Sequence, residues 1–312
     1  MFNCRSILKV LWLLKLIVFY FLEKLLFVLS PQRKKFFIGE IVLITGSANV
    51  IGRQIVLKFA PTAATLVLWD TDDEGNEETS KLAQQLGARR VFTYHCDCSN
   101  KEEVYKQADK VREEVGDVTI LINNASIAVG KKFLELSDAE FEKTIRVNFL
   151  SQVWTCKTFL PAMMAQNHGH LVTTDSAAAL MGIYRFSDYS ASKYAILGMM
   201  EAIDWEVSCA GKDGIKTTIV CPFFVNTALA RGYESKCPLI LPVYEPDYIA
   251  GTIMDAIQKE KFYVILPPTL LFLGFKMLLP RKITLLLLSC LKIADSMDRA
   301  YSQKKKDKTK KF

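Results

Sequence analysis

Histidine is scarce in this chain of 312 residues, which contains only His95, His168 and His170. None of the three lies at a zinc-like spacing from two cysteines. The eight cysteines are scattered along the chain and form no Cys-x-x-Cys pair. These absences argue against a metal site or a disulfide-stapled fold, and they indicate free thiols in a reducing compartment.

Acidic residues are outnumbered by basic ones, which leaves a formal net charge of +7. The basic residues gather in residues 33–35 and 304–311, and both runs flank apolar segments. Attraction to anionic lipid headgroups explains this arrangement better than binding to nucleic acid. Because the mean hydropathy of +0.16 is high for a soluble protein, we expect contact with membrane lipids and no nucleic-acid partner.

An apolar segment opens the chain, and in residues 7–29 nineteen of twenty-three side chains are apolar or aromatic. No small-residue cleavage pattern comes after it, so residues 1–30 are predicted to be a retained membrane anchor. The length approaches the roughly 20 residues that span a bilayer. Its four charges fall within one half of a helix, which equally suits a helix lying in the interface. Residues 33–35 favour a cytosolic side for the domain that begins after them.

A second apolar segment covers residues 267–292 and is broken at Pro280. Neither of its two runs is long enough to span a bilayer, so we predict a membrane-facing helix pair. Packing onto the domain's own core is the alternative. Residues 303–312 are rich in lysine, and we expect this basic tail to be disordered.

Short apolar runs alternate with helical patterns through residues 36–266. The runs are rich in Val, Ile and Leu and lack clean alternation, as expected for parallel strands covered on both faces. This order predicts an α/β domain with a Rossmann-type doubly wound parallel sheet, and ligands at the carboxyl ends of its strands. The predicted strands are 40–45, 65–69, 90–95, 118–122, 170–174, 215–221 and 263–266, and the predicted helices are 76–86, 102–114, 139–166 and 187–209.

A turn marked by Gly46 and Gly52 joins the first predicted strand to a helical pattern. Such a turn lets backbone N–H groups face a pyrophosphate at the positive end of the helix. Asp70 ends the second strand, where a carboxylate accepts hydrogen bonds from ribose hydroxyls and repels a 2′-phosphate. These features favour NAD over NADP.

The spacing of Ser176, Tyr189 and Lys193 along the chain indicates general acid/base chemistry. Tyr189 and Lys193 are four residues apart, so on a helix they share one face. A nearby ammonium stabilises the phenolate and lowers a tyrosine pKa from its usual value of about 10. The pattern predicts Tyr189 as a general acid/base with Ser176 as a hydroxyl donor to a substrate oxygen.

Together these motifs resemble the short-chain dehydrogenase/reductase superfamily over roughly residues 35–266. The amino-terminal apolar segment and the sequences at 66–70 and 221–227 are most similar to its 16C family, which includes retinol and 17-beta-hydroxysteroid dehydrogenases. The residues that carry the resemblance occur in the family's order: Thr45, Gly46, Gly52, Asp97, Asn123, Asn124, Ala125, Asn148, Ser176, Tyr189, Lys193, Pro222 and Thr227.

The resemblance implies catalytic roles for Asn148, Ser176, Tyr189 and Lys193. Tyr189 would be the acid/base, Lys193 would also hold the nicotinamide ribose, and Asn148 would seat a water in a proton relay. The residues implied to bind NAD are Gly46, Ser47, Asn49, Ile51, Asp70, Asp97, Asn124, Tyr189, Lys193 and Thr227.

Three residues depart from the superfamily pattern. Val50 stands where the cofactor turn usually has its second glycine, and a branched side chain there threatens to crowd the pyrophosphate or to need an unfavourable backbone angle. Ser126 replaces the glycine after Asn-Asn-Ala, and Phe223 replaces the glycine after Pro222. The last two changes are tolerable, whereas Val50 leaves open a chain that keeps the fold but binds cofactor poorly.

The implied activity is oxidation of a lipophilic alcohol by NAD, with retinol as the first substrate and a sterol as the alternative. Apolar residues beside Ser176 and a lid over 228–248 would contact that substrate. The resemblance also implies a homodimer and the endoplasmic reticulum membrane, with lipid droplets as a second location. The residues singled out for substrate contact are Leu180, Met181, Ile183, Tyr184, Phe186, Leu229, Tyr233, Leu239, Ile240 and Tyr244.

Overall fold

The computed structural model describes residues 11–20, 22–23, 35–227 and 233–309. Contacts divide the chain into two units, Met1–Lys35 and Phe36–Phe312. In the first unit, residues 11–20 are helical and their side chains are mostly exposed. No helix within the described ranges combines the length and apolarity needed to cross a membrane. Much of the predicted anchor lies outside the described residues, so that anchor stays a prediction.

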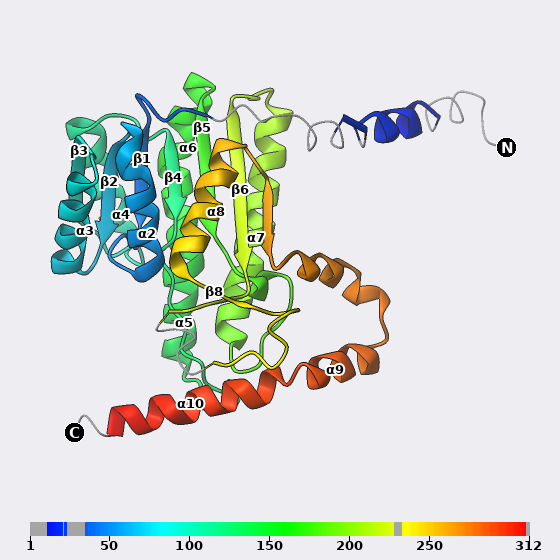
Figure 1. Ribbon diagram of the computed structural model, residues 1–312. Helices are drawn as coiled ribbons and strands as arrows, with labels where there is room; N and C mark the ends of the chain where they lie inside the picture. Colours follow the sequence, from blue (N-terminus) through cyan, green and yellow to red (C-terminus); the bar gives the residue numbers. More distant parts are fainter. Residues whose placement is uncertain (1–10, 21, 24–34, 228–232, 310–312) are drawn as a thin grey trace. The chain divides into compact units, whose positions relative to one another are not determined.

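The second unit is built on a parallel seven-stranded sheet in the order β3-β2-β1-β4-β5-β6-β9 (Figure 1). The chain order reverses between β1 and β4, which is where a doubly wound sheet opens a crevice at the carboxyl ends of its strands. The predicted fold class and all seven predicted strands are confirmed. The strands are β1 Ile41–Thr45, β2 Thr65–Asp70, β3 Arg90–His95, β4 Ile120–Asn123, β5 Gly169–Thr174, β6 Ile215–Pro222 and β9 Tyr263–Leu266.

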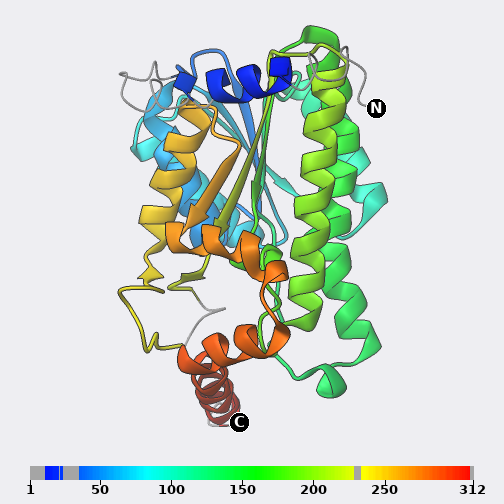
Figure 2. The same ribbon diagram turned by 90° about the vertical axis from the view of Figure 1, so that its right-hand side faces the viewer.

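Helices cover both faces of the sheet (Figures 1 and 2). Successive strand residues point to opposite faces, so Val42 and Ile44 enter one apolar core while Leu43 enters the other. Both cores are apolar, which explains why the strands lack polar alternation. One core includes α2 Val50–Phe59, α3 Asp73–Gln85 and α8 Pro246–Gln258, and the other includes α4 Lys101–Glu114, α6 Ser151–Gln166 and α7 Ser187–Cys209.

Three elements differ from the sequence prediction. The single helix predicted over 139–166 is interrupted, because α5 Asp138–Ile145 passes through the π-helical turn η3 Arg146–Leu150 before α6 begins. Of the predicted lid over 228–248, residues 228–232 lie outside the described residues, and much of 233–245 is irregular. This stretch includes one strand of a small parallel pair formed by β7 Phe224–Val225 and β8 Val243–Tyr244. Helix α8 was not predicted, and it packs against α2.

The end of the chain folds back under the carboxyl edge of the sheet (Figure 2). It comprises η5 Pro268–Leu278, α9 Arg281–Cys290 and α10 Ile293–Thr309. Leu270, Ile293 and Met297 are buried with Phe186 and Phe223, so part of the second apolar segment packs onto the domain itself.

The basic tail is not disordered over its whole length, because α10 continues to Thr309. Ile293, Met297 and Ala300 are buried on one face of this helix and fasten its first turns to the domain. Extending an established helix costs less than nucleating one, which explains how a lysine-rich sequence remains helical.

Candidate active site

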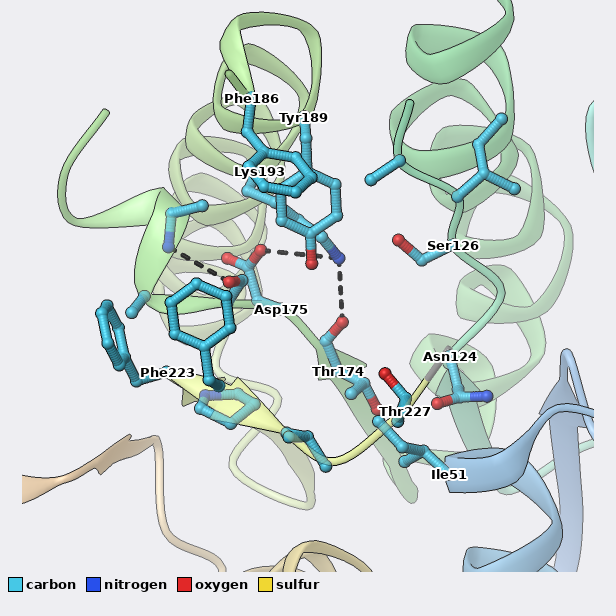
Figure 3. A pocket seen from close by; sticks show the side chains of 18 of the residues that line it. Ile51, Asn124, Ser126, Thr174, Asp175, Phe186, Tyr189, Lys193, Phe223 and Thr227 are labelled. Atoms are coloured by element: carbon cyan, nitrogen blue, oxygen red, sulfur yellow. Dashed lines mark hydrogen bonds and ion pairs between the residues drawn. The ribbon is translucent and has the colours of Figure 1, made fainter. Parts of the chain in front are cut away.

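A cavity of about 450 Å³ opens where β4, β5 and β6 end (Figure 3). The residues implied by the sequence for catalysis and for the nicotinamide half of a cofactor largely meet here. Ile51, Asn124 and Thr227 lie on one side, and Tyr189 and Lys193 lie on another (Figure 3). The lining residues from 49 to 178 are Asn49, Val50, Ile51, Asn124, Ser126, Ile127, Ala128, Thr174, Asp175, Ser176, Ala177 and Ala178.

The glycine-marked turn is packed too tightly for side chains at either glycine. Gly46 has φ +66°, and a Cβ there would lie 2.7 Å from Asn49 Nδ2 and 2.9 Å from Ala125 Cα. A Cβ on Gly52 would lie 2.0 Å from the Gly46 carbonyl oxygen. Asn49 caps α2 by accepting a hydrogen bond from the Gly52 N–H at 2.8 Å. The first turn of the helix thus faces the cavity with its positive end.

Asn124 fastens this turn to the middle of the sheet. Its side-chain amide donates to the carbonyl oxygens of Thr45 and Gly46, both at 3.1 Å. The Thr45 hydroxyl in turn accepts from the backbone N–H groups of Asn124 and Ala125. Asn124 is buried, so it shapes the cofactor side of the cavity mainly by holding the turn in place.

Ser47 belongs to the turn predicted to bind cofactor, but it does not line the cavity. Its hydroxyl is buried and contacts Asn76 Oδ1 at 2.7 Å, and its N–H donates to the Trp69 carbonyl. Ser47 thereby secures the turn against β2 and α3 and has no free backbone donor for a ligand. The sequence pattern did not reveal that Ser47 points inward while Asn49 lines the cavity.

Val50 is the first residue of α2 and is not among the described residues with positive φ. The anticipated backbone strain is therefore absent. Its side chain is 49% exposed and lines the cavity at the helix amino terminus. The steric concern remains, because the Val50 side chain stands at the helix amino terminus, where an anion would bind.

Asp70 and Asp97 occupy the ends of neighbouring strands, outside the cavity lining. Asp70 accepts hydrogen bonds from the backbone N–H groups of Ala48 at 2.8 Å and Asp72 at 3.0 Å. Asp97 accepts one from the Ser99 N–H at 2.9 Å. Each carboxylate is held by the backbone and keeps acceptor capacity for further partners.

Tyr189 and Lys193 share one face of α7, as their spacing predicts. The Lys193 Nζ lies 5.3 Å from the centroid of the Tyr189 ring and donates a hydrogen bond to the Thr174 carbonyl at 3.0 Å. Lys193 is 1% exposed, so little water screens its charge from the phenol. Phe186 packs edge-on against the Tyr189 ring and restricts its position.

Ser176 follows the end of β5 by two residues and caps the short turn η4 Ala177–Ala179. Its hydroxyl oxygen accepts a hydrogen bond from the Ala178 N–H at 3.1 Å, which leaves the hydroxyl proton to be donated. Ser176 and Tyr189 both line the cavity.

Asn148 is buried in the π-helical turn and does not line the cavity. Its Oδ1 accepts from the Ile127 N–H at 2.8 Å, and its Nδ2 donates to the Ile127 carbonyl at 2.9 Å and to the Ser192 hydroxyl at 3.0 Å. Both side-chain donors are therefore used within the protein. The side chain orients the segment after β4 relative to α7. Binding of a relay water by Asn148 stays a prediction.

A buried carboxylate beside this group was not predicted from the sequence. Asp175 Oδ1 lies 3.9 Å from Lys193 Nζ, and the side chain is 0% exposed (Figure 3). Burial raises the pKa of Asp175 to about 7, while the Lys193 ammonium acts in the opposite direction. The sequence does contain a signal for Asp175, because an acidic residue stands directly between an apolar predicted strand and Ser176.

The substrate side of the cavity is apolar, but only part of it matches the predicted residues. Ile183 and Phe186 line it as predicted, whereas Leu180 packs into the core and Tyr184 faces Asp298.

The residues predicted for the lid do not form one surface. Tyr233 stacks on Phe224, and Tyr244 packs against the core that includes α8. Leu239 and Ile240 are exposed. Met181 is buried, and Leu229 lies outside the described residues. The remaining lining residues are Tyr189, Lys193, Pro222, Phe223, Phe224, Val225 and Thr227.

The other two departures from the family pattern fit the cavity. Phe223 forms part of its apolar wall and packs edge-on against Phe224. Ser126 directs its hydroxyl into the cavity (Figure 3), and this oxygen has no hydrogen-bond partner among the described residues.

Known proteins resemble the chain over nearly its whole length. Epidermal retinol dehydrogenase 2 of Homo sapiens is 48% identical over 306 residues, which cover 98% of this chain and 99% of the relative. The 17-beta-hydroxysteroid dehydrogenase 13 of Homo sapiens is 39% identical over 282 residues, covering 90% of this chain and 93% of the relative.

Solved structures resemble it in fold as well. A short chain dehydrogenase/reductase of Burkholderia phymatum, crystallised in complex with NAD, superposes with a TM-score of 0.70. It is 26% identical, and the match covers 78% of this chain and 94% of that one. The sequence pattern of the short chain dehydrogenase family matches residues 40–238. With the fold, the glycine turn and the Ser176, Tyr189 and Lys193 arrangement in place, the chain belongs to the short-chain dehydrogenase family.

Proposed function

We propose that this protein is an oxidoreductase that uses NAD to oxidise a lipophilic alcohol, with all-trans-retinol as the first candidate. The observation that carries the proposal is the apolar cavity that Ser176, Tyr189 and the buried Lys193 all line. Its walls of Ile183, Phe186 and Phe223 suit an alcohol with a large hydrocarbon part. The similarity to a retinol dehydrogenase supports retinol among such alcohols.

The residues at the cofactor side fit NAD. The backbone around Gly46 approaches other backbone so closely that no side chain would fit, and the amino terminus of α2 faces the cavity. Asp70 at the end of β2 suits ribose hydroxyls and disfavours a 2′-phosphate. When bound, NAD supplies the acceptor for the hydride removed from the alcohol carbon.

The protein's own part in the reaction is to hold and move a proton at the substrate oxygen. Ser176 donates a hydrogen bond to that oxygen and fixes its position near the Tyr189 hydroxyl. Tyr189 in its phenolate form accepts the alcohol proton, and the Lys193 ammonium stabilises the phenolate. The apolar walls exclude water, which strengthens these interactions.

Membrane association accompanies this proposal. Several apolar side chains of η5 and α9 are exposed near the basic residues Arg281 and Lys282, a combination suited to an interface with anionic lipid. We place the protein at the endoplasmic reticulum membrane, with lipid droplets as a second location and the catalytic domain in the cytosol. The exposed apolar residues are Leu271, Phe272, Met277, Leu278, Ile283, Leu285, Leu286 and Leu287.

Two alternatives rest on specific observations. A sterol substrate is supported by the similarity to a 17-beta-hydroxysteroid dehydrogenase. Weak cofactor binding is supported by the Val50 side chain at the helix amino terminus.

For assembly, we propose a homodimer through the helices that carry Asn148 and Tyr189. The proposal is in keeping with the exposure of Trp205 on α7, which is 74% exposed.

The test measures all-trans-retinol turnover and NADH binding in the detergent-solubilised full chain. Tyr189→Phe should abolish turnover while leaving NADH affinity within about twofold, because only the proton acceptor is lost. Estradiol turnover in the same preparation distinguishes the two substrate classes. Undiminished retinol oxidation by Tyr189→Phe would rule out the assigned mechanism.

A further inference from the structure

Asp175 is a charged residue that the reaction described above does not use. It comes directly after β5 and lies between Thr174, whose carbonyl binds Lys193, and Ser176. Its side chain is 0% exposed, and neither carboxyl oxygen forms a hydrogen bond of normal geometry with a described residue, although the backbone N–H of Ser176 is close enough to lower its pKa somewhat. Burying a carboxylate without such bonds is costly, so its nearest cation strongly affects its charge state.

The nearest cation is Lys193, whose ammonium also stabilises the Tyr189 phenolate in the proposed reaction. Lys193 Nζ lies 3.9 Å from Asp175 Oδ1 and 5.3 Å from the centroid of the Tyr189 ring. The separation from Asp175 is too long for a hydrogen bond, but it is short for two charges in a poorly screened interior. One ammonium therefore interacts with both acidic groups (Figure 3).

We propose that Asp175 is a positioning residue that acts through Lys193 and keeps Tyr189 protonated to a higher pH than Lys193 alone would allow. The proposal rests on the function given above, in which Tyr189 is the acid/base. A carboxylate beside the ammonium offsets part of its positive potential at the phenol, and it also repels the phenolate directly. Ionised Asp175 thus opposes formation of the base that oxidation requires.

The groups around Asp175 leave Lys193 as its cationic partner. Helix α7 presents Lys193, and Tyr189 lies beyond it. Strand β6 presents the buried thiol of Cys221, whose pKa is raised by burial and by Asp175 itself. The turn η4 consists of Ala177, Ala178 and Ala179 and adds no charge. Because the pKa of Asp175 is raised to about 7, its charge develops around neutral pH.

The charge of Asp175 affects both the oxidation of the alcohol and the reverse reduction of the carbonyl. Oxidation needs Tyr189 as the phenolate, whereas reduction of a carbonyl needs it protonated. An ionised Asp175 moves the pH range of oxidation upward and extends the range in which Tyr189 can donate a proton.

The experiment follows Tyr189 ionisation without turnover, by the near-ultraviolet absorbance of the phenolate. A pH titration of the full chain is compared with that of Tyr189→Phe, and the same difference is measured with Asp175→Asn present in both proteins. The Tyr189 midpoint should fall by about one pH unit when the carboxylate is neutralised. A midpoint that does not move, or that rises, would overturn the proposal.

Two further variants keep the result interpretable. Asp175→Ser also removes the charge, but with a smaller side chain. It should lower the Tyr189 midpoint as Asp175→Asn does, which would show that the shift does not come from a packing change caused by asparagine. Glu206→Gln removes an exposed carboxylate from the same helix and should leave the Tyr189 midpoint unchanged. If retinol is not oxidised but the midpoint shifts as expected, the proposed substrate fails while the role of Asp175 stands.

Discussion

Asp298 of α10 accepts a hydrogen bond from the Nε of Arg185 at 2.6 Å, which ties the end of the chain to the loop before the catalytic helix. The Arg185 side chain is 8% exposed, and its guanidinium also lies 4.2 Å from the centroid of the Tyr301 ring. Arg185 adopts a positive φ of 68°, a conformation that these contacts help to maintain. This loop contributes Ile183 and Phe186 to the cavity wall.

Replacing Asp298 by alanine should loosen that wall. The folded state should lose about 1 kcal/mol, a modest value because the Asp298 side chain is 46% exposed. The KM for a lipophilic alcohol should rise more than kcat falls, since the wall binds the substrate and does not touch the reacting atoms. Urea unfolding and steady-state kinetics measure the two effects. Asp295→Ala on the same helix is the control, and equal behaviour of the two variants would count against this role.

Val50→Gly should increase NADH affinity, because it removes a branched side chain from the amino terminus of α2. We expect an increase of about tenfold, which corresponds to roughly 1.4 kcal/mol. Fluorescence titration of NADH into the solubilised chain provides the measurement. Val50→Ala separates the removal of bulk from the added backbone freedom of glycine. If neither variant binds more tightly, the cavity accommodates Val50 without cost.

Gly52→Ala should abolish NADH binding and destabilise the domain. The new Cβ would lie 2.0 Å from the Gly46 carbonyl oxygen, so the turn cannot keep its shape. The matched control is Gly251→Ala in α8, where the nearest atom would be 4.0 Å away. That variant should be stabilised by roughly 0.5–1 kcal/mol, because alanine favours the helix. Normal NADH binding by Gly52→Ala would show that the turn tolerates displacement.

The pH dependence of stability should differ between the unsubstituted chain and Asp175→Asn. The pKa of Asp175 is raised to about 7 in the folded state, above its ordinary value of 3.8. The folded protein therefore holds this proton more tightly than the unfolded chain, and its free energy of unfolding falls as the pH rises from about 4 to about 7. The loss amounts to at most about 4 kcal/mol.

Urea unfolding at pH 5 and pH 8 measures this effect. Asparagine carries no proton to lose, so Asp175→Asn should gain stability relative to the unsubstituted chain as the pH rises. Its absolute stability also reflects a buried amide, which is why the change with pH is the informative quantity. A difference between the two proteins that is independent of pH would contradict the buried, titrating carboxylate.

The sequence predicted the sheet well because its parallel strands are covered on both faces and therefore read as short apolar runs. Helix α7 was predicted with its observed bounds, Ser187–Cys209. The π-helical turn at Asn148 could not be predicted, since it depends on hydrogen bonds to Ile127 and Ser192 that lie far away in the chain or on another helix. Helix α8 was missed because the residues before it had been assigned to a lid.

The placement of Tyr189 beside Lys193 was predictable because the two residues are local neighbours on one helix. The direction of each side chain in the glycine turn was not, because Ser47 and Asn49 are both short and polar. Only the partners of Ser47 on β2 and α3 turn it inward. The burial of Asp175 likewise depends on the packing of α7 and β6 around it.

The packing of α10 behind the cavity wall also affects the order of events during synthesis. The last strand of the sheet ends at Leu266, whereas Ile293 and Met297 of α10 complete the cluster around Phe186 and Phe223. Chains begin to fold from the amino terminus as they are made. The sheet and α7 can thus assemble while Phe186 and Phe223 still lack the apolar support of α10. Until α10 has been made, Phe186 and Phe223 remain more exposed than in the folded protein, because Ile293 and Met297 are not yet there to cover them.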